Sequence, residues 1–500
     1  MTRTLNRGLV EELRAGGSLV VLPTWDMLEL PEHAVQFGTG ALLRGFVDDF
    51  LHRANAAGTF NGRIVAIAST GSTRDKALSD QDGLYTLVVE GIERGERVQQ
   101  SRVISSLSRA ISATENWAGV LKVARSPELQ YVFSNTTEVG IVADAESGRD
   151  DMPPRSFPAK LTRFLYERAT AFDHVDEKGV IVIPCELIEN NGTKLRQIVL
   201  DIAARWDLGD QFSAWIERAV PFCNTLVDRI VPGSPRADDA KRLRDLVGYD
   251  DAMLTCCEPY CLFAIEGDDV LRAKMPWTWV DAGIVVAPDI APYRKRKVHL
   301  LNGAHSLIAP LALAMGCETV LDAMNTPAIA QFAHNAMLDE IAPTLNVEGA
   351  AEFAEAVLDR FRNPFIRHAL IDITLQATMK MRVRNVPSIE RSVAVTGRVP
   401  QSLAFGFAGF LLFMKGDIQA ERKVKGLSVP VDDQASRLHS LWSAEPGDNA
   451  RLVASVCRDT ALWGTDLSAI DGFCESVAGH LERMRTQGVS AALEHLLQVR

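Results

Sequence analysis

The segment that most constrains the fold is a strand pattern that runs into two glycines and then into a helical pattern. Residues 34–37 are apolar apart from one glutamine, Gly38-Thr39-Gly40 follows, and amphipathic periodicity extends over residues 42–56. A strand, a glycine turn and a helix in this order are typical of α/β folds, in which such a turn lets the backbone approach a pyrophosphate. The third glycine of the GxGxxG pattern is missing because Leu43 stands there, so an ordinary strand-to-helix turn remains an alternative.

Strand and helix patterns alternate as far as about residue 290 of the chain. Strands are predicted at residues 63–68, 131–133, 179–184 and 284–286, and helices at residues 116–124 and 158–169. Residues 83–89 and 96–104 indicate an antiparallel hairpin inserted in this series. The alternation predicts an α/β domain with a Rossmann-like, doubly wound sheet.

Beyond Lys295 the strand patterns almost disappear and helical periodicity dominates. The predicted helices cover residues 328–341, 350–361, 367–381, 401–414, 435–442, 449–463 and 467–485, with a last one from residue 489. Because 500 residues exceed what one hydrophobic core supports, we expect two domains, a Rossmann-like one at 1–290 and a mostly α-helical one at 291–500. The apolar segment 401–414 is too short and too interrupted by glycine to span a bilayer, so it predicts a buried helix.

Composition and charge exclude several kinds of partner. The net charge is -11, and no run rich in Lys or Arg stands out, so nucleic acid is not expected to bind. Residues 1–17 lack the apolar core of a signal peptide, which indicates a cytoplasmic protein without a membrane partner. Eight scattered cysteines, with no zinc-type ligands beside Cys256, Cys257 and Cys261, predict no bound metal. We expect a monomer or a small homo-oligomer.

Lys297, Asn302 and His305 are three polar residues in a largely apolar segment, at spacings of five and three. If the segment is helical, these spacings are close to whole turns and bring the three side chains to one side of the helix. A desolvated lysine can act as a general acid or base, an amide can stabilise an alkoxide, and an imidazole adds a hydrogen bond. A satisfied polar seam between domains remains the alternative.

Two further groups of polar residues occur in apolar surroundings. Asn135, Thr136 and Glu138 follow the predicted strand at 131–133, where parallel sheets bind ligands, although they could equally cap the next helix. Asp228 and Arg229 stand between apolar flanks and predict a buried ion pair, which is more commonly structural than catalytic.

These motifs resemble the polyol-specific long-chain dehydrogenases typified by mannitol dehydrogenase. The resemblance covers nearly the whole chain and rests on Lys297-x4-Asn302-x2-His305, on the segment 220–232 and on Gln81-Asp82-Gly83-Leu84-Tyr85. Further segments resemble the members of this family that act on uronates. They are residues 36–44, 133–138, 158–163, 183–188 and 360–364.

The resemblance implies a zinc-independent, NAD-dependent oxidoreductase that transfers a hydride between the nicotinamide and C3 of a linear keto-uronate. Lys297 would be the acid-base catalyst, Asn302 would stabilise the alkoxide, and His305 would orient the substrate. The implied cofactor-binding residues are Val35, Gln36, Phe37, Gly38, Thr39, Gly40, Ala41, Arg44, Asn135, Thr136 and Glu138. The implied substrate-binding residues are Asp228, Arg360 and Lys380.

Two departures from the mannitol-type pattern affect the expected substrate. Cys185-Glu186-Leu187 replaces Cys-Asp-Asn, and Asp372 replaces an arginine eight residues before Lys380, so a neutral hexitol fits less well than a sugar acid. The acid that NAD-specific folds place after the second strand is absent and Arg74-Asp75 follows, which leaves NADP open. A nucleotide-binding sensor without catalysis is the alternative of a different class.

Overall fold

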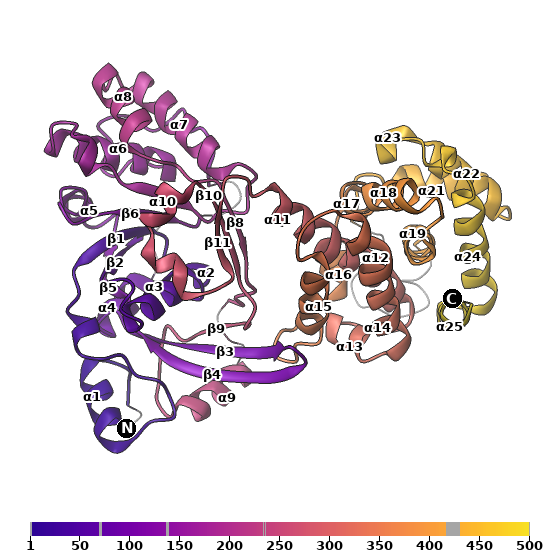
Figure 1. The fold of residues 1–500 in the computed structure, drawn as a ribbon, viewed down its shortest axis with the longest axis horizontal. Helices are drawn as coiled ribbons and strands as arrows, with labels where there is room; N and C mark the ends of the chain where they lie inside the picture. Colours follow the sequence, from indigo (N-terminus) through magenta and orange to yellow (C-terminus); the bar gives the residue numbers. More distant parts are fainter. Residues whose placement is uncertain are drawn as a thin grey trace. The chain divides into compact units, whose positions relative to one another are not determined.

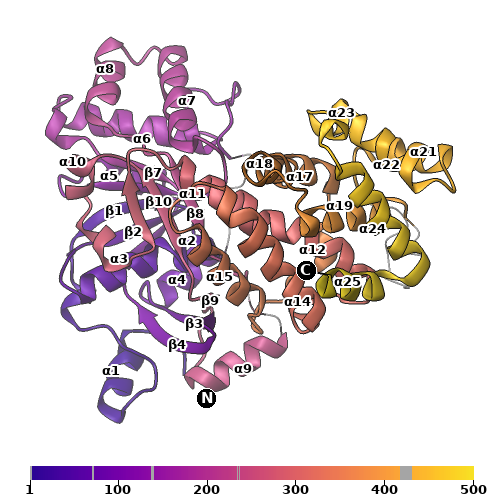
Figure 2. The ribbon, with the colours of Figure 1, turned by 45° about the vertical axis from the view of Figure 1, so that its right-hand side comes forward.

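The computed structural model describes residues 3–69, 73–136, 140–233, 235, 237–416 and 431–499. The chain divides into two compact units. The first consists of Met1–Glu90 and Arg97–Ile290, and the second of Gly91–Glu96 and Ala291–Arg500. Each unit has its own architecture, and Figures 1 and 2 label their elements.

The first unit is built on a five-stranded parallel sheet in the order β5-β2-β1-β6-β7. Its strands are β1 (Glu32–Phe37), β2 (Arg63–Ala68), β5 (Leu107–Ser112), β6 (Tyr131–Ser134) and β7 (Ile181–Pro184). Counted along the chain, these five strands have the order 3-2-1-4-5, which is the order of Rossmann folds. The predicted Rossmann-like sheet is therefore confirmed, and the order of its strands changes direction between β1 and β6.

Helices cover both faces of this sheet, and most side chains of β1, β2, β6 and β7 are therefore buried and apolar (Figure 1). Successive side chains of a strand point to opposite faces, and Val35 and Phe37 therefore pack in one core while Ala34 packs in the other. The first core is formed with α5 (Trp117–Ala124), α6 (Phe157–Ala171), α7 (Asn191–Arg205) and α8 (Asp210–Ala219). The second is formed with α3 (Val47–Ala56), α4 (Arg74–Asp80) and the 3-10 helix η3 (Pro276–Val280).

Two smaller sheets and several short helices complete the first unit, except for the hairpin tip Gly91–Glu96, which is assigned to the second unit. The predicted hairpin is confirmed as β3 (Tyr85–Glu93) and β4 (Glu96–Ile104), joined at Arg94 and Gly95, whose φ angles of 52° and 77° suit a two-residue turn. β9 (Thr255–Cys257) pairs with β3, and β8 (Thr225–Asp228), β10 (Leu262–Glu266) and β11 (Ile284–Ala287) form the third sheet. The other helices are α1 (Arg7–Gly16), η1 (Asp26–Leu28), α2 (Ala41–Arg44), η2 (Asp176–Lys178), α9 (Ala237–Val247) and α10 (Asp269–Ala273).

The helix predicted over residues 42–56 is interrupted, and this prediction was wrong in detail. α2 ends at Arg44 and α3 begins at Val47. A Cβ atom at Gly45 would lie 2.8 Å from Val231 Cγ1, and the Gly45 carbonyl accepts a hydrogen bond of 2.9 Å from Arg229. The segment after β8 therefore packs directly against the backbone at the break.

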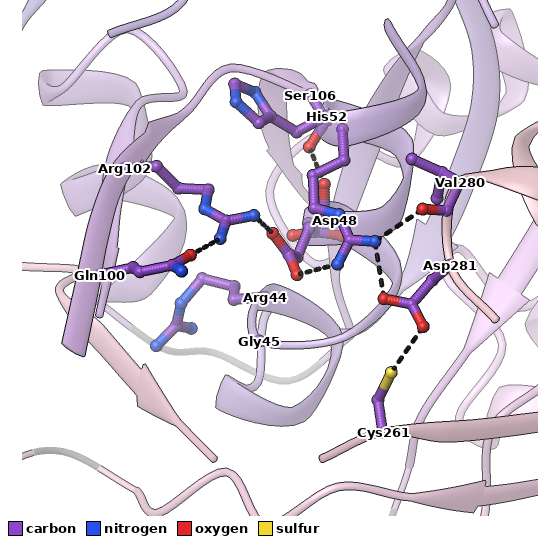
Figure 3. A network of polar contacts seen from close by, with 12 residues as sticks. Arg44, Gly45, Asp48, His52, Gln100, Arg102, Ser106, Cys261, Val280 and Asp281 are labelled. Atoms are coloured by element: carbon purple, nitrogen blue, oxygen red, sulfur yellow. Dashed lines mark hydrogen bonds and ion pairs between the residues drawn. The ribbon is translucent and has the colours of Figure 1, made fainter. Parts of the chain in front are cut away.

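A buried polar network holds α3 in place against β4 and the segment after η3 (Figure 3). The carboxylate of Asp49 is fully buried and accepts hydrogen bonds from Arg229 at 3.0 Å and Arg102 at 3.1 Å, while Arg53 lies 3.8 Å away. Burial opposes ionisation of Asp49, but the three arginines hold its pKa below the usual value. The predicted ion pair of Arg229 with Asp228 was therefore wrong, because neighbouring side chains of an extended segment point to opposite faces.

The second unit is helical. Among its described residues from 291 onward no strand is assigned, which confirms the predicted change of fold class. Its helices are α11 (Ala291–Arg296), η4 (Lys297–Asn302), α12 (Gly303–Ala314), α13 (Val320–Met324), α14 (Pro327–His334), η5 (Asn335–Ile341), η6 (Ala342–Thr344), α15 (Ala350–Phe361), α16 (Leu370–Ile373), α17 (Ala377–Arg384), α18 (Val386–Thr396), α19 (Gln401–Met414), α21 (Ala435–Ala444), α22 (Asn449–Arg458), α23 (Thr460–Trp463), η7 (Leu467–Ala469), α24 (Phe473–Gln487) and α25 (Val489–Gln498). The single helix predicted over residues 367–381 is instead α16 and α17, separated at Gln376, whose φ is 52°.

α19 is the buried central helix of this unit, as predicted for residues 401–414, and it packs between α12 and α24 (Figure 1). Its two glycines lie against α12. Cβ atoms at Gly406 and Gly409 would collide with the side chains of Leu307 and Leu311. The glycines therefore serve close helix packing. No helix in the described part of the chain is long and apolar enough to cross a membrane.

Candidate active site

The glycine turn after β1 lies at the carboxyl end of the strand beside β6, where open α/β sheets bind ligands. Gly38 has a φ of 132°, and a Cβ there would lie 3.0 Å from the Asn135 carbonyl oxygen, so the fold itself requires glycine. Gly40 has an ordinary φ of -70°, and no described heavy atom lies within 4 Å of a Cβ built there. The fold does not require glycine at position 40, and the space in front of this residue suits a ligand that approaches the backbone.

The side chains of the other predicted cofactor residues around this turn point into the protein or contact the turn itself. Val35 and Phe37 have fully buried side chains in the sheet core, and the Gln36 amide donates to the Gly38 carbonyl at 3.1 Å. Ala41 opens α2, whose N-terminus begins at the turn. These contacts fix the path of the turn.

Arg44 was predicted to bind the cofactor, and its side chain is turned into the protein. The guanidinium donates to the Thr39 carbonyl and, at 2.9 Å, to the Thr255 hydroxyl, and it lies over the Tyr85 ring. Only 7% of Arg44 is exposed, and burial lowers its pKa. Arg44 therefore positions Thr39 within the glycine turn.

The residues that follow β6 are held by a glutamate that the sequence did not single out as a site residue. The Thr136 N–H and hydroxyl donate to Glu186 at 3.0 and 3.1 Å, the Ser134 hydroxyl donates to the same carboxylate at 3.1 Å, and the Asn135 amide donates to the Cys185 carbonyl at 2.8 Å. Glu186 is 2% exposed, and its burial raises its pKa. The position of Glu186 two residues after the predicted strand at 179–184 was the available signal. The predicted cofactor residue Glu138 lies outside the described residues.

Lys297, Asn302 and His305 lie on one continuous helical segment, whose first part is π-helical. In a regular α-helix, residues five apart differ in direction by about 140°, which would separate Lys297 from Asn302. The segment Lys297–Asn302 is π-helical, and its i→i+5 bonding places residues five apart on successive turns. The prediction of a helix is confirmed, but a regular α-helix was the wrong geometry for this site.

The three side chains differ in burial and in hydrogen bonding. Lys297 and Asn302 are half-buried, and the side-chain amide of Asn302 makes no hydrogen bond within the described part of the chain. The backbone carbonyl of Asn302 accepts from Arg384 at 3.2 Å and from Ser306 at 3.1 Å. The amide of Asn302 is therefore available to a ligand while its backbone is fixed.

His305 is buried between two rings, with 8% of its surface exposed. Its imidazole stacks on Phe361 at 4.3 Å between centroids and meets the edge of His368 at 4.8 Å. Its Nε2 atom is buried without a hydrogen-bond partner among the described residues. Burial, followed by the positive charges of His368 and Arg384, holds the pKa of His305 well below its usual value. At neutral pH this imidazole is uncharged and can exchange hydrogen bonds with a ligand.

The predicted substrate residues lie in different units. Asp228 ends β8 in the first unit and is 6% exposed. Arg360 on α15 and Lys380 on α17 belong to the second unit, and their charges both act on His305. Arg360 and Lys380 therefore stand within electrostatic range of the predicted catalytic helix.

Known protein families and individual relatives match this chain over nearly its whole length. Residues 32–279 match the family model of the mannitol dehydrogenase Rossmann domain, and residues 289–485 match that of the mannitol dehydrogenase C-terminal domain. Altronate oxidoreductase of Bacillus subtilis strain 168 is 39% identical over 468 residues, which cover 93% of this chain and 95% of that protein. Altronate oxidoreductase of Escherichia coli strain K12 is 38% identical over 477 residues, which cover 94% and 97%.

Two solved structures share the fold. Mannitol 2-dehydrogenase of Pseudomonas fluorescens, in a ternary complex with NAD and D-mannitol, is 24% identical, with a TM-score of 0.67 and coverage of 99% of both chains. D-sorbitol dehydrogenase in substrate-free form is 22% identical, with a TM-score of 0.77 and coverage of 98% of this chain and 100% of that one.

The Rossmann sheet, the glycine turn and the helix with lysine, asparagine and histidine define a dehydrogenase that acts on a CH–OH group with a nucleotide cofactor of the NAD type. The chain belongs to the mannitol dehydrogenase family.

Proposed function

We propose that this protein is a tagaturonate reductase, also called altronate oxidoreductase, which interconverts tagaturonate and altronate with NADH and NAD in hexuronate catabolism. The proposal is supported by relatives named altronate oxidoreductase that are 38–40% identical over at least 93% of this chain. The observation that carries it is the π-helical geometry of Lys297–Asn302, which sets residues five apart on successive turns, beside an uncharged His305 near positively charged side chains. An uncharged imidazole in a basic environment suits a hydroxylated substrate that also carries an anionic group.

In the proposed reduction, Lys297 donates a proton to the carbonyl oxygen of the keto-uronate as the carbon accepts a hydride. The Asn302 amide donates a hydrogen bond to the same oxygen while negative charge develops on it. The neutral His305 orients a neighbouring hydroxyl group through Nε2. In the oxidation of altronate, unprotonated Lys297 removes the proton from the hydroxyl group.

The proposed cofactor is NAD, which when bound supplies or accepts the hydride. The residues that would hold its pyrophosphate are Gly38, Thr39 and Gly40, and the free space in front of Gly40 fits this role. A cavity of 740 Å³ beside Arg44 is lined by residues of both signs, so its charge does not discriminate between NAD and NADP. Besides Arg44, the charged lining residues are Arg74, Lys76 and Arg244 together with Asp80, Asp250 and Asp251.

The test is a panel of substrates with each cofactor. Purified protein is offered tagaturonate, fructuronate, fructose and tagatose with NADH and with NADPH, and absorbance is followed at 340 nm. We expect the highest kcat/KM with tagaturonate and NADH, and the reverse reaction with altronate and NAD. A higher kcat/KM for a neutral ketose would overturn the proposed substrate class. NADH binding without turnover of any substrate would indicate a nucleotide-binding sensor.

A further inference from the structure

Two basic side chains on α17 face the catalytic helix without an acidic partner. Lys380 and Arg384 stand four residues apart, which places them on one face of α17, and this helix packs against α12. Neither forms an ion pair with a carboxylate in the described part of the chain. Like charges at this spacing repel each other, so the arrangement is unfavourable in the absence of an anion.

Arg384 is fixed at the catalytic helix by one of its two terminal nitrogens. Nη1 donates to the Asn302 carbonyl at 3.2 Å and to the Ser306 hydroxyl at 3.0 Å. Nε and Nη2 of Arg384 make no hydrogen bond with the described residues. The guanidinium is therefore held in one orientation, with an edge left for a ligand that accepts two hydrogen bonds, as a carboxylate does.

The Lys380 ammonium and the His305 imidazole are two further hydrogen-bonding groups near Arg384. The Lys380 ammonium donates to the Ile373 carbonyl at 3.1 Å, which uses one of its three protons. The buried Nε2 of His305 has no hydrogen-bond partner among the residues that the structure describes, and the next residue, Ser306, accepts a hydrogen bond from Arg384. Lys380 and Arg384 lie one helical turn apart on α17, and burial, followed by the charge of Arg384, lowers the pKa of Lys380.

Neither the C-terminus of α17 nor a nearby acidic side chain fully explains why two basic side chains lie here. Arg384 ends α17, and a helix C-terminus favours a cation, but this does not explain a second, partly buried cation one turn earlier. Asp372 is the acid whose charge acts on His368, and it is itself exposed. Within the described part of the chain, Asp372 forms no ion pair with Lys380 or Arg384.

We infer that Arg384, together with Lys380 and His305, forms a subsite for the carboxylate of the substrate. This inference rests on the proposed function, because it assigns the recognition of the acid group within the same site. Arg384 holds the carboxylate by two parallel hydrogen bonds, Lys380 neutralises its charge, and His305 Nε2 contacts the adjoining hydroxyl or the carboxylate. Arg384 is thus a residue for specificity toward sugar acids.

The test compares Arg384→Met and Arg384→Lys with wild type on tagaturonate and on tagatose, in which a hydroxymethyl group replaces the carboxylate. We expect Arg384→Met to lower kcat/KM for tagaturonate about 10²-fold and for tagatose less than about fivefold, with an unchanged Kd for NADH. Arg384→Lys should recover part of the loss because it restores the charge without the two-pronged geometry. The matched control is Arg382→Met, an exposed arginine on the same helix, which should leave both substrates unaffected.

Further measurements distinguish an error in the carboxylate subsite from an error in the proposed function. Ser306→Ala removes a hydrogen bond that positions Arg384 but keeps its charge, and it should lower kcat/KM for tagaturonate less than Arg384→Met does. Equal losses on both substrates in Arg384→Met, or a selective loss of NADH affinity, would overturn the carboxylate subsite while leaving the proposed function intact. A wild-type enzyme that prefers tagatose would overturn the proposed function itself. If Arg384→Met does not fold, the ratio of the two activities in Arg384→Lys decides, because an unchanged ratio contradicts the inference.

Discussion

Gly40→Val separates the binding role of the glycine turn from its structural role. The backbone at position 40 has φ -70° and ψ 162°, a conformation that valine adopts readily, and the described residues leave open space for its side chain. The lower entropy of the unfolded chain contributes about 0.4–1 kcal/mol of stability. The weaker preference for valine at a helix N-cap costs about as much. We therefore expect the free energy of unfolding to change by less than about 1 kcal/mol.

In contrast to the stability, the affinity for NADH should fall strongly in Gly40→Val. A valine side chain would occupy the space in which a pyrophosphate approaches the backbone, and each lost hydrogen bond to a charged group costs about 1.5–3 kcal/mol. The expected result is a rise in the Kd for NADH of at least about tenfold, measured by fluorescence titration. Urea unfolding followed by circular dichroism gives the stability on the same samples.

Gly38→Ala is the matched control for this experiment. Its φ of 132° and the 3.0 Å approach of its Cβ to the Asn135 carbonyl predict a loss of more than about 1 kcal/mol in the free energy of unfolding. A folded Gly40→Val protein with the wild-type Kd for NADH would refute the reasoning, and the turn would then be only structural.

Three further predictions concern Lys297, Lys380 and the buried carboxyl group of Asp48. Lys297→Ala should lower kcat by about 10²–10⁴-fold with an unchanged Kd for NADH, and retention of more than about a third of kcat when chemistry limits the rate would exclude acid-base catalysis by Lys297. Lys380→Met should lower kcat/KM for the keto-uronate by about 10²-fold and much less for a neutral ketose, whereas equal losses would assign Lys380 to the sugar backbone or the fold. Burial raises the pKa of Asp48 from 3.8 to about 8, so the stability that its proton contributes is complete below about pH 4 and is lost as the pH rises to about 8. Asp48→Asn should therefore raise the urea midpoint relative to wild type at pH 8 and leave it nearly unchanged at pH 4, and equal shifts at both pH values would contradict this.

The sequence alone predicted the elements whose stabilising contacts are local or repeat regularly. The helices at 350–361 and 401–414 and the strand at 63–68 have the predicted bounds. Periodic apolar residues mark the buried face of the first, and continuous apolar runs mark the other two as buried on all sides. The change from an α/β unit to a helical unit followed from the same patterns. The sequence also singled out the glycine turn, where a strand, two glycines and a helix are consecutive.

Only the tertiary structure decided the details that depend on contacts between distant segments. The break at Gly45 depends on Val231 and Arg229, and the partner of Arg229 is Asp49, 180 residues away in the chain. No local pattern in the sequence specifies such a pairing, because it arises when β8 and α3 pack together. The hydrogen bonds that Glu186, after β7, accepts from Ser134 and Thr136, at the end of β6, also join segments far apart in the chain.

The same distinction applies to the candidate active site. The sequence supplied the residue types and spacing of Lys297, Asn302 and His305, but a spacing of five does not bring side chains together in an α-helix. The π-helical turn provides the required geometry. The packing of α17 against α12 then places Arg384 in contact with Asn302, 82 residues away in the chain. Residue chemistry is therefore readable from the sequence, whereas the convergence of side chains depends on helix irregularity and on long-range packing.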